Sequence, residues 1–302
     1  NLFIINGRQN NLIEGFWFIN KKDSITITDV KYNFQNNVET TVLNAIEKNG
    51  SYYLIGTLDE VDGFIAKYNS NFNLMWCKRF FSSQRMYWPE NIFSKGDKLF
   101  VSVSEYEIYT EPSGTQGRIG NSLFLCLDSL DGSINYYRHY YDGNRSIPGG
   151  SSVPNQQLSN DRQNLHRTIL WNDHIYVVTH NLYTGNIYSL FHPLNVYKLD
   201  LMFNVVWAKY FDVTINNGPS ILSDLKIKGN SLEISALSTF PTQCVEVVLN
   251  LNQNGNVNNV KRNFWSIPPN YFHPTNTWDH SPFALKKIKI GSNTIASATS
   301  YF

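Results

Sequence analysis

The strongest constraint on the fold is a hairpin pattern that recurs along the chain. The segment "KYNSNFNLMWCKRF" (67–80) has an apolar strand, a tight turn and a second strand that ends in basic and aromatic residues. Segments 127–140, 198–211 and 249–264 have the same form, and segment 18–34 is a weaker copy. The chain therefore repeats one structural unit, and this unit determines the architecture.

A second type of hairpin lies between these copies. It occurs as "NAIEKNGSYYLIGT", "NIFSKGDKLFVSVS", "TILWNDHIYVVTH", "DLKIKGNSLEISA" and "KKIKIGSNTIASAT". The turn dipeptides (Asn-Gly, Gly-Asp, Asn-Asp, Gly-Asn and Gly-Ser) tolerate the positive φ angles that two-residue hairpins require. The flanking residues alternate apolar and polar side chains, which is the periodicity of strands, and no window has the periodicity of a helix.

Two hairpins make four strands, here called A to D in chain order, and a four-stranded unit at this spacing is typical of β-propeller blades. The sequence therefore predicts an all-β, single-domain β-propeller over residues 1–302, built of four-stranded antiparallel blades. The chain opens and closes with segments that match B strands, so four complete and two partial blades are expected. Five or six blades fit best, with terminal blades that are incomplete or shared. A β-sandwich or a solenoid remains the alternative architecture.

Two of the segments resemble the repeats of known bacterial propellers. The stretches "LDSLDGSINYY" and "KLDLMFNVVWAKYF" are similar to the repeats of quinoprotein-like propellers and of secreted bacterial propeller proteins. The resemblance implies the propeller fold and no particular activity, because the ligands of a calcium-bound quinone do not occur here. The aromatic series Trp76, Tyr136 and Trp207 is expected to pack between blades, although Asn259 takes the matching position in the fourth copy.

Composition excludes several classes of partner. With 25 basic and 24 acidic residues the net charge is +1, which argues against nucleic acid or an anionic membrane as partner. The apolar runs are too short for a transmembrane helix, and no signal peptide is visible. The polar surface of Asn, Ser and Thr suggests an extracellular, cell-surface or virion location. The three cysteines lie in apolar runs and are expected to be small buried side chains (Cys77, Cys126 and Cys244).

The long connections are predicted to lie at one end of every blade. In a meander of four strands, the A–B and C–D turns share one end, and the B–C and D–A connections share the other. The short turns are all A–B or C–D, whereas the long segments are B–C or D–A (82–90, 104–121, 142–164, 212–220 and 265–282). Long loops on a rigid scaffold are where binding sites usually occur.

One of these loops has the composition of a binding site. Segment 265–283 combines aromatic rings with short polar groups, which suits sugar rings and equally suits a protein partner. Sealing of a gap between blades is the structural alternative, and segment 140–164 has the composition of a linker. The predicted binding residues are Trp265, Tyr271, Phe272, His273, Trp278, Asp279 and His280.

The sequence favours binding over catalysis. We expect a non-enzymatic binding or adhesion propeller that recognises a glycan or a protein, without cofactor, metal or catalytic residues. A structural subunit of an extracellular or virion assembly is the first alternative. A glycoside hydrolase is the second, for which Asp279 with Glu90 or Asp212 are the available acids.

Overall fold

The chain divides into two compact units, Asn1–Ser159 and Asn160–Phe302. In this computed structural model the backbone is described for all strands and most short turns. Side chains are described for residues 40–59, 61–106, 121–140, 167–179, 194–211, 224–236 and 245–264. The described residues contain strands and turns and no helix. The single domain over 1–302 remains a prediction.

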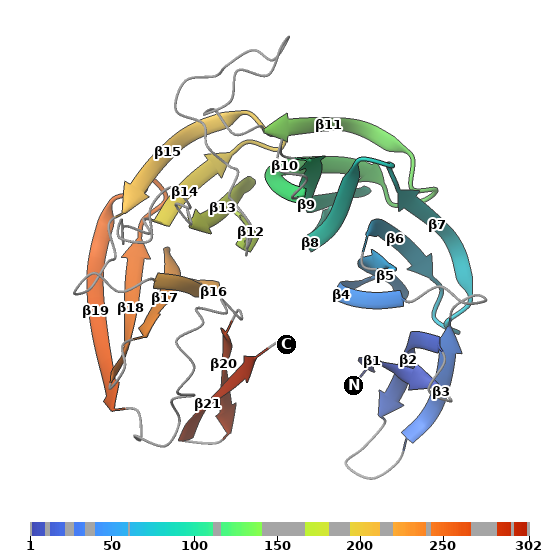
Figure 1. Cartoon of the computed structure of the whole chain (residues 1–302), viewed down its shortest axis with the longest axis horizontal. Helices are drawn as coiled ribbons and strands as arrows, with labels where there is room; N and C mark the ends of the chain where they lie inside the picture. Colours follow the sequence, from blue (N-terminus) through green and yellow to red (C-terminus); the bar gives the residue numbers. More distant parts are fainter. Residues whose placement is uncertain are drawn as a thin grey trace. The chain divides into compact units, whose positions relative to one another are not determined.

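Unit 1 contains one three-stranded and two four-stranded antiparallel sheets, each a meander of consecutive strands (Figure 1). The three-stranded sheet is β1 (Leu2–Gln9), β2 (Ile13–Lys21) and β3 (Ile27–Asn33). The next is β4 (Thr40–Lys48), β5 (Ser51–Leu58), β6 (Asp62–Tyr68) and β7 (Leu74–Phe80). The third is β8 (Arg85–Lys95), β9 (Lys98–Thr110), β10 (Gln116–Asp128) and β11 (Ile134–Tyr140).

Unit 2 contains two four-stranded sheets and one hairpin. The first sheet is β12 (Arg167–Trp171), β13 (His174–His180), β14 (Leu194–Leu199) and β15 (Val205–Phe211). The second is β16 (Ser220–Lys228), β17 (Ser231–Thr239), β18 (Gln243–Leu251) and β19 (Val257–Ser266). The hairpin is β20 (Phe283–Ile290) with β21 (Asn293–Ser300). Four complete predicted blades and two partial ones are thus confirmed, each complete blade having the strand order A-B-C-D.

The predicted A–B turns are tight two-residue hairpins. Asn49 and Gly50 have φ angles of 51° and 69°, and Asn172 and Asp173 have φ angles of 46° and 62°. Two consecutive positive φ angles match the right-handed twist of the flanking strands, and Asn, Asp and Gly adopt them at least cost.

The C–D turns are longer, and three of the four in the complete blades share one hydrogen-bonding pattern. The side-chain oxygen of Asn69 accepts from the backbone N–H groups of Asn71 and Asn73, both at 3.0 Å. Asp200 and Asn252 make the same pair of bonds in unit 2. Each turn also contains one residue with positive φ, and these residues are Phe72, Gly132, Phe203 and Gly255. In the turn, a short Asn or Asp side chain thus accepts hydrogen bonds from backbone N–H groups that have no partner in the ladder. These bonds stabilise the turn.

Apolar cores lie between adjacent blades within each unit. In unit 1, Tyr53, Ile55 and Ile65 of one blade pack with Leu99 and Val101 of the next. In unit 2 a corresponding core joins β12–β15 to β16–β19 through Tyr176, Val178, Val196, Ile234 and Leu249. Full burial of each such side chain contributes about 1.5–3 kcal/mol, so blade stacking within a unit is the main source of stability.

The aromatic series is confirmed as inter-blade packing for two of its members. Trp76 Nε1 donates to the backbone oxygen of Leu130 at 2.9 Å, in the C–D turn of the following blade. Trp207 Nε1 donates to the backbone oxygen of Gln253 at 3.2 Å in the same way. The rings lie so close to these turns that only glycine fits at Gly132 and Gly255 without displacement.

Three predictions about local structure are wrong. Segment 82–90 is mostly strand, since β8 begins at Arg85, and segment 104–121 is mostly an extension of β9 and β10. The turn and proline signals in these segments were outweighed by pairing with the neighbouring strand. Cys77 is exposed because β7 is an edge strand whose two faces both reach solvent, whereas Cys126 is buried as expected. The side chain of Cys244 lies outside the described residues.

Candidate functional site

The predicted aromatic binding segment lies largely outside the described residues. Trp265 belongs to β19, where its backbone pairs with Cys244. The other predicted binding residues (Tyr271, Phe272, His273, Trp278, Asp279 and His280) fall in 267–282, which the structure does not describe. Their role as a binding site therefore stays a prediction.

The strand bounds show where the long connections leave the blades. The long connections are 181–193, which is a B–C connection, and 141–166, 212–219 and 267–282, which are D–A connections. The sequence analysis did not identify 181–193. The A–B turns and the C–D turns are short throughout the described chain. Every long connection thus leaves its blade at the B–C and D–A end, here called the loop end, as predicted.

The β8–β11 blade projects furthest at its loop end. The β9–β10 ladder runs without interruption from the pair Leu99 and Leu127 to the pair Thr110 and Gln116. It is longer than any ladder of the β4–β7 blade. The base of this projection, where side chains are described, contains the densest group of buried polar residues in unit 1 (Ser102, Ser104, Glu105, Asn121 and Ser122).

On one face of the sheet, this group contains a buried carboxylate. Glu105 on β9 is 0% exposed, and Arg85 Nη1 on β8 donates to its Oε1 at 2.6 Å. His139 Nδ1 on β11 lies 3.4 Å from Oε2 of the same carboxylate. Tyr87 pairs with Glu105 across the β8–β9 ladder, so its side chain projects from the same face of the sheet. Three strands thus contribute titratable groups to one desolvated cluster, here called the Glu105 cluster.

The electrostatics of the Glu105 cluster follow from burial. Desolvation lowers the pKa of His139, with Glu105 acting to raise it and Arg85 to lower it further. Desolvation also raises the pKa of Tyr87, and the negative charge of Glu105 adds to the shift. Both shifts favour the neutral forms of the His139 imidazole and the Tyr87 phenol at neutral pH. The ion pair between Arg85 and Glu105 compensates the buried charge.

The opposite face of the same sheet carries an aromatic pair and a second carboxylate. The rings of Trp88 and Tyr106 meet edge to face with centroids 5.8 Å apart. Glu90, one of the acids available to a hydrolase, accepts a hydrogen bond from Ser104 Oγ at 2.9 Å. Asp212 and Asp279, the other two, lie outside the described residues.

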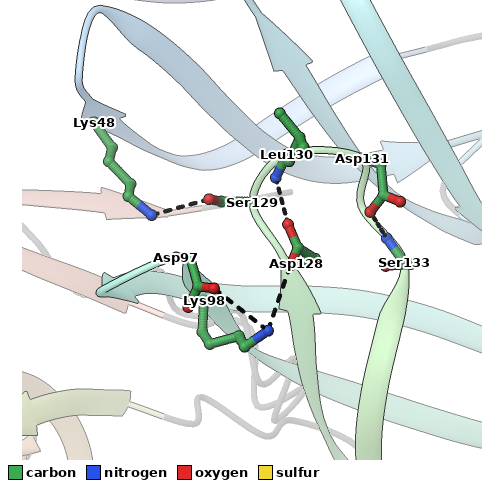
Figure 2. Close-up of polar contacts among 8 residues, drawn as sticks. All are labelled: Lys48, Asp97, Lys98, Asp128, Ser129, Leu130, Asp131 and Ser133. Carbon is green, nitrogen blue, oxygen red and sulfur yellow. Dashed lines mark hydrogen bonds and ion pairs between the residues drawn. The ribbon is translucent and has the colours of Figure 1, made fainter.

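The opposite end of this blade is held by polar contacts around its C–D turn (Figure 2). Within the turn, Leu130 N–H donates to Asp128 Oδ1 and Ser133 N–H donates to Asp131 Oδ1, each at 2.8 Å. Lys48, at the end of β4 in the preceding blade, donates to Ser129 Oγ at 3.0 Å. The bond from Ser133 lowers the pKa of Asp131. These contacts join the two blades and use polar groups for structure.

Neither a metal centre nor a membrane helix is found in the described part of the chain. Within those residues no three His, Cys, Asp or Glu side chains are grouped so as to hold a metal ion. Among the same residues no helix has the length and hydropathy needed to cross a membrane.

Sequence reasoning missed the Glu105 cluster because it treated 104–121 as a loop. One signal could have revealed the strand: "SVSEYEIYT" continues the alternation of "LFV" without a break. The meeting of Arg85, Glu105 and His139 had no such signal, since it depends on the register of three strands.

Comparisons with known proteins assign the fold. No family model matches the chain, and no curated protein matches its sequence. Among solved structures, a polysaccharide lyase, ulvan lyase, aligns with a TM-score of 0.51 and 11% identity over 93% of this chain and 68% of its own. A periplasmic gluconolactonase of Pseudomonas aeruginosa aligns with a TM-score of 0.46 and 9% identity, covering 88% of this chain and 70% of its own. The four-stranded meanders and the likeness to the lyase show that the chain has a β-propeller fold; the resemblance to bacterial repeat propellers holds at the level of fold.

Proposed function

We propose that the chain is a non-enzymatic binding module that recognises a glycan at the loop end of its blades, outside the cell or on a virion. The observation that carries the proposal is the position of the long connections, which all leave their blades at that end. A rigid scaffold with extended connections at one end supplies variable contact surface at little cost to stability. The aromatic and polar residues of segment 265–283 provide ring faces and hydrogen-bonding groups suited to sugars.

The burial of Glu105 argues against this carboxylate as the acid of a hydrolase. A general acid must reach the glycosidic oxygen, and its pKa must be tuned for proton transfer. Glu105 is fully buried, and Arg85 already neutralises its charge. The ulvan lyase shows that a protein of this fold can act on a polysaccharide, but 11% identity carries none of its residues over to this chain.

A glycan-array screen of the purified chain tests the proposal. We expect a defined set of glycans to bind, and a Trp265→Ala/Trp278→Ala variant to bind roughly a hundredfold more weakly, about 1.4 kcal/mol per lost ring. Leu130→Ala is the matched control, since Leu130 is 77% exposed and lies in a C–D turn at the other end of its blade.

Two results would contradict the proposal. If no glycan on the array binds at high protein concentration, the chain is not a glycan-binding module. Binding accompanied by release of shortened sugars would replace the binding module with a hydrolase or lyase.

A structural role in an assembly is the second candidate, and one observation favours it. Large apolar side chains are exposed at the C–D turn end of the complete blades. They lie in the turns or at the start of the D strands, and the most exposed are Leu74 (49%), Met75 (58%), Leu130 (77%), Ile134 (52%), Met202 (56%) and Val206 (51%). Recurrent exposed apolar groups of this kind are typical of protein contact surfaces.

A further inference from the structure

The described part of the loop end of the β4–β7 blade contains one strongly exposed aromatic ring. Phe81 follows β7 directly, in the D–A connection to β8, and its side chain is 73% exposed. Among the large hydrophobic side chains described, only Leu130 is more exposed, and Leu130 lies at the other end of its blade. A single exposed ring does not make a binding site by itself, so the groups around Phe81 decide its use.

A charged pair lies beside this ring. Arg79 on β7 pairs with Phe64 on β6, and Asp62 projects from the same face of the sheet because side chains alternate along a strand. The guanidinium of Arg79 forms an ion pair with Asp62. It also lies 5.8 Å from the centroid of the Phe81 ring, which is a cation–π contact. Arg79 thus links the exposed ring to the carboxylate, and the three side chains form one group.

The carboxylate of Asp62 has one oxygen without a hydrogen-bond donor. Arg79 directs both Nε and Nη2 to the same oxygen, Oδ2, and the bond from Nε is 2.7 Å long. Within the described part of the chain no group donates to Oδ1, although Asp62 is only 8% exposed. Carboxylate oxygens in such a position are normally hydrogen-bonded. The free oxygen next to an exposed ring therefore indicates a place for a donor from a ligand.

These three side chains together suit a sugar ring. The C–H face of a pyranose stacks on an aromatic ring, and its hydroxyl groups bond to polar side chains beside that ring. A sugar hydroxyl can donate to Asp62 Oδ1, and a neighbouring hydroxyl can accept from Arg79, whose side chain is 54% exposed. The charges of Asp62 and Arg79 cancel, so the pair favours a neutral sugar over a charged one.

We infer that Asp62, Arg79 and Phe81 bind one ring of a neutral sugar with adjacent hydroxyl groups, at the loop end of the β4–β7 blade. The inference rests on the proposed glycan binding and adds a contact site in unit 1, where none of the sequence-predicted binding residues lies. It also specifies the ligand, because a ring face and two neighbouring hydroxyl groups are required together.

Neutral oligosaccharides test the inference. Affinities are measured for cello-, manno- and galacto-oligosaccharides of equal length, each beside its permethylated form, which keeps the ring and lacks hydroxyl donors. We expect at least one unmodified oligosaccharide to bind and its permethylated form to bind about tenfold or more weakly. Phe81→Ala and Asp62→Asn should each weaken binding about tenfold, whereas Phe81→Trp should keep it because indole also stacks. Leu130→Ala is the matched control, and an unchanged thermal transition shows that the variants are folded.

The remaining outcomes distinguish this inference from the glycan proposal. Glycan binding that Phe81→Ala leaves unchanged overturns the inference and leaves the glycan proposal standing. Binding confined to sulfated or carboxylated glycans has the same consequence, because the ligand would then not be a neutral sugar. No binding to any glycan on the array or to any of these oligosaccharides overturns both.

Discussion

At the scale of single residues, Glu105 shows how a charge is kept inside the protein. A carboxylate without solvent exposure is costly unless a cation compensates it, and Arg85 and His139 approach it from two other strands. The cluster lies at the base of the β9–β10 projection and connects side chains of β8, β9 and β11.

The protonation of His139 makes the stability of this region depend on pH. Because burial lowers its pKa in the folded state, the unfolded chain takes up a proton first as the pH falls below about 6.5. His139 therefore contributes a loss of stability below that pH, by at most about 1.4 kcal/mol per pH unit.

Denaturant unfolding at about pH 7.5 and pH 5.5 measures this contribution. We expect the free energy of unfolding to fall less between the two values in His139→Gln than in the native chain. Equal falls in the two proteins would show that His139 does not titrate differently in the folded state.

At the scale of elements, a clamp of three donors joins neighbouring blades. Tyr53 and Lys67 donate to the backbone oxygen of Ser129 at 2.9 Å and 3.0 Å, beside the bond from Trp76 to Leu130. In unit 2, the three donors Tyr176, Lys198 and Trp207 reach the backbone oxygen of Gln253.

The clamp occurs in alternate complete blades. The register positions of Tyr53, Lys67 and Trp76 are taken by Phe100, Cys126 and Tyr136 in the next blade, and by Glu233, Asn250 and Asn259 in the β16–β19 blade. The structural repeat within each unit is therefore a pair of unlike blades: the first carries the donors, and the second presents a glycine-containing turn.

Substitution of the clamped glycine tests this arrangement. Gly132 and Gly96 both have positive φ, at 71° and 57°, so alanine strains either backbone by about 1 kcal/mol. Only at Gly132 would the new Cβ also lie 2.9 Å from the Trp76 ring. We expect Gly132→Ala to lower the free energy of unfolding by roughly 1 kcal/mol more than Gly96→Ala, since overpacking adds to the strain.

The same substitutions in a Trp76→Ala chain test whether the ring causes the extra loss of stability. In a Trp76→Ala chain, the extra cost of Gly132→Ala over Gly96→Ala should disappear in denaturant unfolding. Persistence of that difference would show that the turn, and not the ring, makes alanine unfavourable.

At the scale of the whole molecule, the two ends of the complete blades differ. The loop ends carry the long connections, and the C–D turn ends expose large apolar side chains. If the second surface serves assembly, the chain should associate with itself as its concentration rises. Sedimentation velocity over a concentration series should then show association that Leu130→Ser/Met202→Ser weakens. A monomer at all concentrations would exclude self-assembly through this surface.

The periodicity of the sequence determined the architecture. Hairpin turns such as Asn49–Gly50 and the alternation in "YYLIG" are local signals, because positive φ and strand alternation involve neighbouring residues only. The same signals predicted the four complete blades, the two partial ones and the end from which long connections leave. The packing of Trp76 and Trp207 between blades followed from their recurrence in the repeat.

Tertiary structure alone decided which side chains meet. Arg85, Glu105 and His139 lie on three strands of one sheet, and a shift of one residue in any of the three ladders between them would send a side chain to the opposite face of the sheet. The exposure of Cys77 likewise depends on β7 being an edge strand. A basic residue recurs in the sequence of each D strand. Only the β-bulge that the C–D ladders share shows that these residues occupy equivalent positions in the blades. Local periodicity specifies strands, whereas long-range register decides what those strands bring together.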